Sequence, residues 1–189
     1  MNIYKSLYKA TKNKYNPNDK YGAIYHDNGY LVATNGHILA KIKADYSPEL
    51  EGKIIAPDGK EVNETYMKYQ SFLDAIDRMQ PVSTCNLLQA CKNVVKFKDP
   101  EKNNISLRPD FNVRAKFILD GYDILGKDAE LYIPEEGVIT CCMKSGDSRV
   151  LICSVLLRDD VEVSDLSFTV DEAMTLVIEK KVKKEWYEK

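Results

Sequence analysis

The fold can be inferred first from the segment Leu31-Val32-Ala33-Thr34-Asn35-Gly36-His37-Ile38-Leu39-Ala40, the centre of residues 21–44. Two Asn-Gly pairs, Asn28-Gly29 and Asn35-Gly36, lie seven residues apart between short apolar runs. Asn-Gly tolerates positive φ at both central turn positions, so it favours the type I′ turn of a β-hairpin. The segment therefore predicts a three-strand meander over residues 22–26, 30–34 and 37–43.

Residues 32–40 also resemble a motif of a known family. They read V-A-T-N-G-H-I-L-A and are similar at seven of nine positions to V-A-T-D-G-H-R-L-A, a signature of bacterial sliding clamps, the beta subunit of DNA polymerase III. Asn35 replaces the Asp and Ile38 replaces the Arg. A clamp domain packs two helices against antiparallel sheets, so the resemblance implies a DNA-clamp-like α+β fold. A full clamp subunit has three such domains, and this chain would carry roughly one plus a tail.

Two further segments are similar to clamp sequences. Residues 65–73 match F/Y-P-D/N-Y-x-x-V-L-P in the two tyrosines, Tyr66 and Tyr69, and lack the first proline. Residues 149–157 are similar to the closing strand Y-L-I-M-P-V-R-L and lack its Met-Pro pair. Matched loosely, the resemblance covers about residues 2–157.

Periodicity predicts the other elements. Helical spacing favours helices over residues 3–13 and 84–95, and the capping box Thr169-Val170-Asp171-Glu172 favours a terminal helix. Residues 68–78 are either a short helix or irregular. Residues 121–126 are interpreted as a loop. Strands are expected near residues 53–56, 104–108, 112–119, 129–133, 137–143 and 149–157. We expect a clamp-like domain over residues 1–157, then an acidic linker and an amphipathic C-terminal helix over residues 158–189.

The composition is that of a soluble globular protein, with 44% apolar and 30% charged residues. The net charge of −2 excludes a global attraction to nucleic acid. No apolar run approaches the roughly 18–20 residues of a membrane span, and no signal-peptide core is visible, so we expect a cytoplasmic protein.

The cysteines lack metal-type spacing and predict buried free thiols, with disulfides or a redox pair as alternatives: Cys85, Cys91, Cys141, Cys142 and Cys153.

The resemblance implies a peptide site. In the clamps, residues around the signature help form a surface pocket that grips short linear peptides of polymerases and repair proteins. The matching residues here are Thr34, Gly36, His37 and Leu39. The alternative is that Asn35-Gly36 serves only the turn and His37 begins a strand. The other half of a clamp pocket comes from a neighbouring domain, and Ile38 removes a charged member.

The resemblance also implies contact with double-stranded DNA. In a clamp ring the helices line the central hole, and their basic side chains meet phosphates without reading sequence. The candidates on the two predicted helices are Lys5, Lys9, Lys12, Lys92 and Lys96. The alternative is an ordinary solvated helix face.

No enzyme, metal or cofactor is expected. The chain has two histidines, His26 and His37, and no metal-ligand motif, Walker-type loop or nucleophile elbow.

The first hypothesis for the function is a stand-alone sliding-clamp relative, of phage or mobile-element type, that binds DNA or replication and repair proteins. The second is a protein-interaction module with a clamp fold that does not encircle DNA. The third, kept for contrast, is a thiol hydrolase. A ring needs about six clamp domains, yet no large apolar strand edge is evident, so we expect a monomer or dimer.

Overall fold

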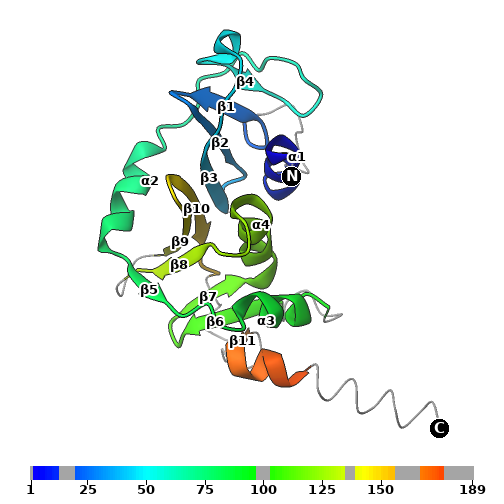
Figure 1. Cartoon of the computed structure of the whole chain (residues 1–189), viewed down its shortest axis with the longest axis vertical. Helices are drawn as coiled ribbons and strands as arrows, with labels where there is room; N and C mark the ends of the chain where they lie inside the picture. Colours follow the sequence, from blue (N-terminus) through cyan, green and yellow to red (C-terminus); the bar gives the residue numbers. More distant parts are fainter. Residues whose placement is uncertain (1, 13–19, 97–102, 135–138, 156–166, 177–189) are drawn as a thin grey trace, which may run out of the picture. The chain divides into compact units, whose positions relative to one another are not determined.

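The computed structural model describes residues 2–12, 20–96, 103–134, 139–155 and 167–176 (Figure 1). Its helices and mostly antiparallel strands confirm the predicted α+β class. The chain divides into two compact units, Met1–Val82 with Asp120–Cys153 and Ser83–Leu119 with Ser154–Lys189. The predicted division at residue 157 stays a prediction, because residues 156–166 lie outside the described ones.

An eight-stranded sheet forms the first unit. Its strand order is β4-β1-β2-β3-β10-β9-β8-β5, and every neighbouring pair is antiparallel. The strands are β1 Ile24–Asp27, β2 Tyr30–Thr34, β3 Ile38–Lys43, β4 Ile54–Ile55, β5 Gln80–Val82, β8 Glu130–Ile133, β9 Thr140–Ser145 and β10 Ser148–Cys153. The meander predicted from the two Asn-Gly pairs is confirmed as β1, β2 and β3. The edge strand β5 was not predicted, and residues 137 and 138, the start of the strand predicted over residues 137–143, lie outside the described residues.

The two Asn-Gly turns differ in backbone conformation. Asn28 and Gly29 both have positive φ, 50° and 78°, as a type I′ turn requires. At the second turn Gly36 has a φ of 87°, whereas Asn35 has no positive φ. The prediction of the same turn at both places is therefore wrong at the second.

The side chain of Asn35 closes the second turn. Its Oδ1 accepts hydrogen bonds from the backbone N–H groups of His37 and Ile38, both at 2.9 Å. This is the local bonding of an Asx turn. Its Nδ2 donates to the carbonyl of Ala10 at 3.2 Å. Asparagine supplies both a donor and an acceptor, so it also ties the turn to the end of the first helix, which aspartate in the ionised form cannot do.

One face of the sheet is covered by helices. Directly paired positions across six strands form a row of fully buried side chains: Ile24, Ala33, Ala40, Val150, Met143 and Leu131. Helix α1 (Ile3–Ala10) contacts this face through Tyr4, whose hydroxyl lies 3.1 Å from Nε2 of His26. Helix α4 (Ala115–Leu125) reaches it through Gly121, where an added Cβ would lie 2.3 Å from Sδ of Met143.

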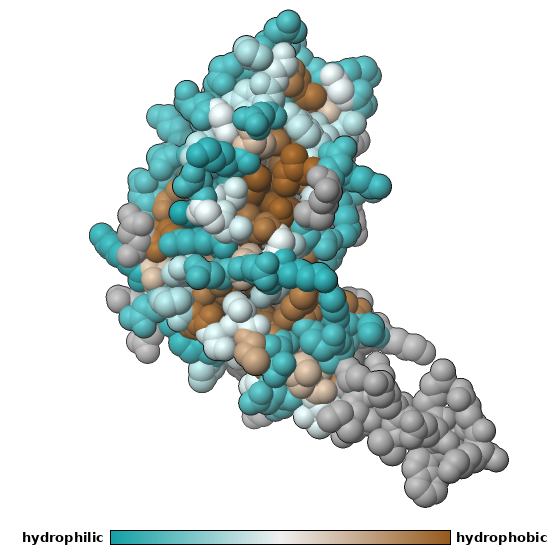
Figure 2. All heavy atoms as spheres, in the orientation of Figure 1, coloured by the Kyte–Doolittle hydropathy of each residue, from teal (hydrophilic) through white to brown (hydrophobic). Residues whose placement is uncertain are grey.

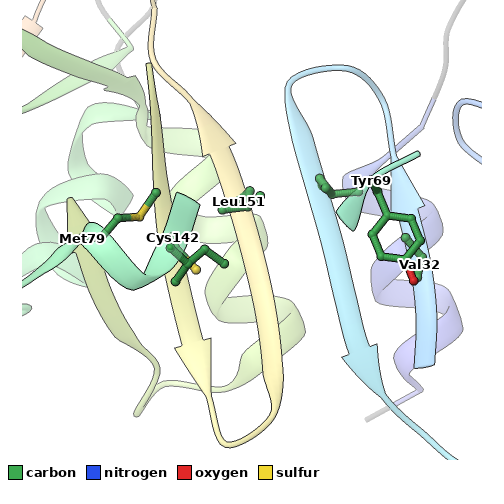
Figure 3. Close-up of a cluster of buried hydrophobic side chains, with 7 residues drawn as sticks. Val32, Tyr69, Met79, Cys142 and Leu151 are labelled. Carbon is green, nitrogen blue, oxygen red and sulfur yellow. The ribbon is translucent and has the colours of Figure 1, made fainter. Parts of the chain in front are cut away.

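The other face is covered by the segment that follows β4. Val32, Leu39, Cys142 and Leu151 on the strands pack against Tyr69, Ile76 and Met79. The last three belong to or flank α2 (Gln70–Asp74) and the 3-10 helix η2 (Ala75–Arg78), so the helical alternative for residues 68–78 is correct. Figure 3 shows Tyr69 beside Val32 and Met79 near Cys142. Figure 2 shows hydrophobic residues gathered over the strands of this sheet, with hydrophilic residues around them.

The largest error of the sequence prediction lies at residues 112–126. The predicted strand over residues 112–119 ends at Arg114, the last residue of β7, and α4 follows from Ala115 to Leu125. The predicted loop over residues 121–126 is mostly the second half of this helix. Ala115, Ile118 and Tyr122 are buried at helical spacing, which the interpretation as a strand overlooked. The second helix on the large sheet is therefore α4.

The glycines of this segment have separate roles. Gly121 lies inside the helix, where the absence of a side chain makes room for Met143. Gly126 has a φ of 98°, and its N–H donates to the carbonyl of Tyr122 at 2.9 Å. This is the usual position of glycine after a helix end.

The second unit contains α3 and a three-stranded sheet. Helix α3 (Leu87–Val94) begins three residues later than predicted. In the sheet, β6 (Asn104–Arg108) pairs antiparallel with β7 (Phe111–Arg114) and parallel with β11 (Ser167–Thr169). Residues 170–176 are helical, and the predicted capping box is confirmed: Glu172 accepts from the Thr169 N–H at 2.8 Å. Residues 177–189 of the predicted helix lie outside the described ones.

Candidate functional site

Three exposed lysines lie on helix α1 and just beyond its end. The side chain of Asn2 caps its start, and Leu7 and Ala10 are its buried residues. Lys5, Lys9 and Lys12 are all exposed. A spacing of four residues places Lys5 and Lys9 on one side of the helix. Lys12 follows the helix end and is close to them in sequence. We call Lys5, Lys9 and Lys12 the α1 lysine face; its contact with DNA stays a prediction.

An aspartate from α4 lies within this face. Nζ of Lys9 is 2.6 Å from Oδ2 of Asp123, and this hydrogen bond raises the pKa of Lys9. Both side chains are more than half exposed, so such a pair stabilises the fold by only ~0–1 kcal/mol. Its larger effect is to neutralise one cation of the face. Asp123 was not among the predicted site residues, because residues 121–126 were interpreted as a loop.

The other two predicted DNA contacts belong to the second unit. Lys92 lies in α3 and Lys96 follows its end, and both are exposed. The lysines of α1 lie in the first unit. The predicted set of five thus divides between two units, and DNA contact by Lys92 and Lys96 also stays a prediction.

Two of the four predicted pocket residues have buried side chains. Oγ1 of Thr34 donates to the carbonyl of Ile38 at 2.7 Å and accepts from the Gly36 N–H at 3.1 Å. Leu39, the cross-strand partner of Thr34, is only 7% exposed and packs in the cluster that contains Ile76. Both side chains therefore stabilise the hairpin and the sheet.

The other two pocket residues are exposed at the turn. Gly36 and His37 lie at the surface, beside the end of β10. The N–H of Cys153 donates to the carbonyl of His37 at 2.9 Å, and Sγ of Cys153 lies 3.8 Å from the carbonyl oxygen of Gly36. The structure therefore joins this turn to β10, a neighbour that the sequence did not reveal. Peptide binding at the turn stays a prediction.

His26 is a buried structural residue. Its Nδ1 lies 3.1 Å from the carbonyl oxygen of Lys53, which can only accept, so Nδ1 carries the proton. Nε2 then accepts from the Tyr4 hydroxyl at 3.1 Å. The ring also meets that of Tyr46 edge-on, with 4.9 Å between centroids. Burial lowers the pKa of His26, so the neutral ring is the form that the fold holds.

We expect the free energy of unfolding to decrease as the pH falls below about 6.5. The folded pKa of His26 is lowered, so its stabilisation is complete above the unfolded pKa and is lost as the pH falls through the folded value. Urea unfolding between about pH 5 and pH 8, with an NMR titration of the imidazole, measures this. His37→Gln is the control and should keep the pH dependence. An imidazole of His26 that titrates above the usual histidine range would contradict the expectation.

The buried thiols have raised pKa values. The five cysteines are free; three are buried and Cys153 is half-buried, whereas the exposed Cys85 departs from the prediction of buried thiols. Burial raises the pKa of Cys91 and of Cys142 to about 12 each. A catalytic thiol needs a lowered pKa, so these two are unsuited to hydrolysis. Within the described ranges, no group of histidine, cysteine and acidic residues could hold a metal ion.

A tyrosine-rich hollow was not predicted. It has a volume of about 660 Å³ and lies between β1 and residues 64–71. The rings of Tyr25 and Tyr66 stack with 4.9 Å between centroids, and the Tyr69 hydroxyl donates to the carboxylate of Asp27. The two tyrosines that match the clamp segment, Tyr66 and Tyr69, both line it.

None of the helices described is both long and apolar enough to cross a membrane.

No protein-family model matches the sequence, and no curated protein matches it either. Solved sliding clamps do match the fold. The C. crescentus beta sliding clamp aligns with a TM-score of 0.62 and 11% identity over 82% of this chain and 63% of that one. The DNA polymerase III subunit beta of Pseudomonas aeruginosa gives 0.59 and 12% over 81% and 64%. The Helicobacter pylori beta clamp, solved with a DNA ligase peptide bound, gives 0.56 and 14% over 82% and 62%.

These matches establish the fold. The chain spans less than two thirds of the length of these clamps. It has a sliding-clamp fold, and the resemblance inferred from residues 32–40 is confirmed at that level.

Proposed function

We propose that this chain, which has the fold of a bacterial sliding clamp, is a non-enzymatic protein that binds the phosphate backbone of double-stranded DNA. The observation that supports this is the α1 lysine face, whose three side chains are exposed while Leu7 and Ala10 of the helix are buried. Lysines meet phosphates as point charges, so the contact carries no sequence information.

The strength of binding follows from the local charge. The net charge of −2 gives no general attraction to DNA, so binding depends on the three lysines of this face. Each phosphate contact steepens log K against log salt by about 0.9, so Lys5 and Lys12, which Asp123 does not neutralise, give a slope of about −1.8. We expect retention on duplex DNA at low salt that fades steeply as salt is added.

Asp123→Asn is expected to strengthen DNA binding at low salt by about twofold to tenfold. The carboxylate neutralises Lys9 and repels phosphates, so its removal frees one cation of the face. Fluorescence anisotropy with a duplex of about 20 base pairs, repeated at several salt concentrations, measures the change.

Asp110→Asn is the matched control for this substitution. Asp110 is also exposed and in an ion pair, with Arg108 at 2.5 Å, in the turn between β6 and β7 of the second unit. It should leave DNA affinity unchanged. An equal gain in both variants, or no gain for Asp123→Asn, would mean that α1 is not where DNA binds.

A second candidate function is binding of short linear peptides from replication or repair proteins. It is favoured by the exposure of Gly36 and His37 beside β10. Leu39 is buried in the cluster that contains Ile76 and Met79, so a peptide that reaches it must displace the segment of α2 and η2.

A phage or mobile-element origin and a monomeric or dimeric state stay predictions.

A further inference from the structure

Three positively charged residues form a row across the large sheet. Lys41 on β3 pairs with Arg149 on β10, and Arg149 pairs in turn with Lys144 on β9. Directly paired residues of antiparallel strands share a face, with Cβ atoms about 4.5–5.5 Å apart. The Cβ atoms of these three residues therefore lie on adjacent strands within about 10 Å of one another. We call Lys41, Arg149 and Lys144 the cation row.

The cation row lines a hollow. The hollow has a volume of about 190 Å³, and its other walls are Tyr30 on β2, Leu73 of α2, Ile76 of η2 and Asp147. The three cationic side chains are half-buried in it. One water occupies about 30 Å³ of the liquid, so the hollow has room for a tetrahedral anion with some of its waters.

Two acids lie near the row. Glu130 on β8 is the direct cross-strand partner of Lys144, and its carboxylate accepts from the Tyr132 hydroxyl at 2.8 Å. Asp147 forms an ion pair with Lys43, at 2.7 Å. Among the residues that the structure describes, no carboxylate lies within ion-pair distance of any member of the row. The three cations of the row thus outnumber the two acids beside them, and Asp147 is already paired.

Tyrosine rings hold the two ammonium groups in place. Nζ of Lys41 lies 4.4 Å from the ring centroid of Tyr30, and Nζ of Lys144 lies 4.1 Å from that of Tyr132. A cation–π contact positions an ammonium group but leaves its charge in place. Both ammonium groups are thus oriented and still cationic.

We propose that the cation row binds a phosphate group in this hollow. Nη1 of Arg149 donates to the carbonyls of Gly146 and Ser148, which orients the guanidinium and leaves Nε and Nη2 to donate to two phosphate oxygens. The two lysines add point charges on either side of it. Cations from three strands suit an anion with several charged oxygens better than a single carboxylate. The row lies on the sheet face opposite α1, so the site is separate from the proposed DNA contact.

The test is a titration of isotope-labelled full-length protein with inorganic phosphate and then pyrophosphate, at constant ionic strength. We expect saturable NMR shifts of amides in β3, β9 and β10. The double variant Lys144→Gln with Arg149→Gln should weaken binding at least about tenfold. Lys60→Gln removes an exposed charge outside the hollow and should change nothing. Shifts that grow without saturation, or equal shifts in the double variant, would overturn the proposal.

Thermal unfolding separates loss of the site from loss of the fold. Phosphate should raise the Tm of the wild type in a concentration-dependent way, because it binds only the folded state. The double variant also loses the hydrogen bonds from Arg149 to the carbonyls of Gly146 and Ser148, so its Tm without phosphate is measured first, and phosphate should raise it little above that value. If phosphate raises the Tm of the wild type by no more than it raises the Tm of the double variant, the proposed site is wrong.

The source of the phosphate group is decided by two further ligands. Pyrophosphate represents small phosphorylated molecules, and a single-stranded thymidine oligonucleotide of about ten nucleotides represents a nucleic-acid backbone. Tighter binding of the oligonucleotide, lost in the double variant, assigns the site to a nucleic-acid strand. Binding of pyrophosphate alone assigns it to a small molecule. A glutamate-rich peptide that binds the row more tightly than either would overturn the phosphate assignment.

Discussion

The triple variant Lys5→Glu, Lys9→Gln, Lys12→Glu is expected to lose DNA retention at low salt, with affinity for duplex DNA falling at least about 100-fold. The changes remove three cations from the α1 lysine face and add two anions. Lys9 is changed to glutamine because a glutamate would face Asp123. The fold should remain, because the buried residues of α1 are Leu7 and Ala10. Anisotropy over a range of salt concentrations should also show the slope becoming shallower by about 1.8.

A matched triple variant distinguishes a local site from net charge. Lys43→Gln, Lys68→Glu, Arg78→Glu changes the charge by the same amount on the side of the sheet opposite α1. Lys43 is in an exposed ion pair with Asp147, as Lys9 is with Asp123. This control should retain most of the DNA affinity. If both triple variants lose affinity equally, the α1 lysines serve only solubility and the proposed function is wrong.

Leu39→Ala is expected to lower the free energy of unfolding by about 2–5 kcal/mol. The side chain is 7% exposed and packs with Val32, Leu151 and Ile76, so its truncation leaves a cavity in the cluster. His37→Ala should change stability by less than about 0.5 kcal/mol, because the side chain is exposed. Urea unfolding followed by circular dichroism measures both. Equal small effects would show that Leu39 is not a core residue.

The same pair of variants bears on peptide binding. In a titration with a Q-x-x-L-F-type peptide, His37→Ala should weaken binding by about 1–2 kcal/mol if the turn is a binding site. Amide resonances of residues 34–39 report directly on contact. If they do not move at millimolar peptide, the residues that match the clamp signature serve only the turn and the core.

Local sequence determined several elements fully. The first Asn-Gly pair specifies its turn because only a few residue types tolerate positive φ at two successive positions. The apolar spacing of α1 placed Leu7 inside and the lysines outside. The capping box at Thr169 and Glu172 formed as predicted, because each partner lies within one helical turn of the other. The resemblance of residues 32–40 indicated the fold itself.

Tertiary structure decided what local patterns left open. The run from Ala115 to Leu125 is helical because its buried side meets the sheet, with Gly121 against Met143. Leu39 is a core residue because η2 packs over it. Lys9 meets Asp123, and Lys41 meets Arg149, only because strand pairing and helix packing join residues more than a hundred positions apart. Turns and caps are fixed by interactions within a few residues, whereas burial and charge neighbours depend on which distant segments pair, which no short stretch of sequence encodes.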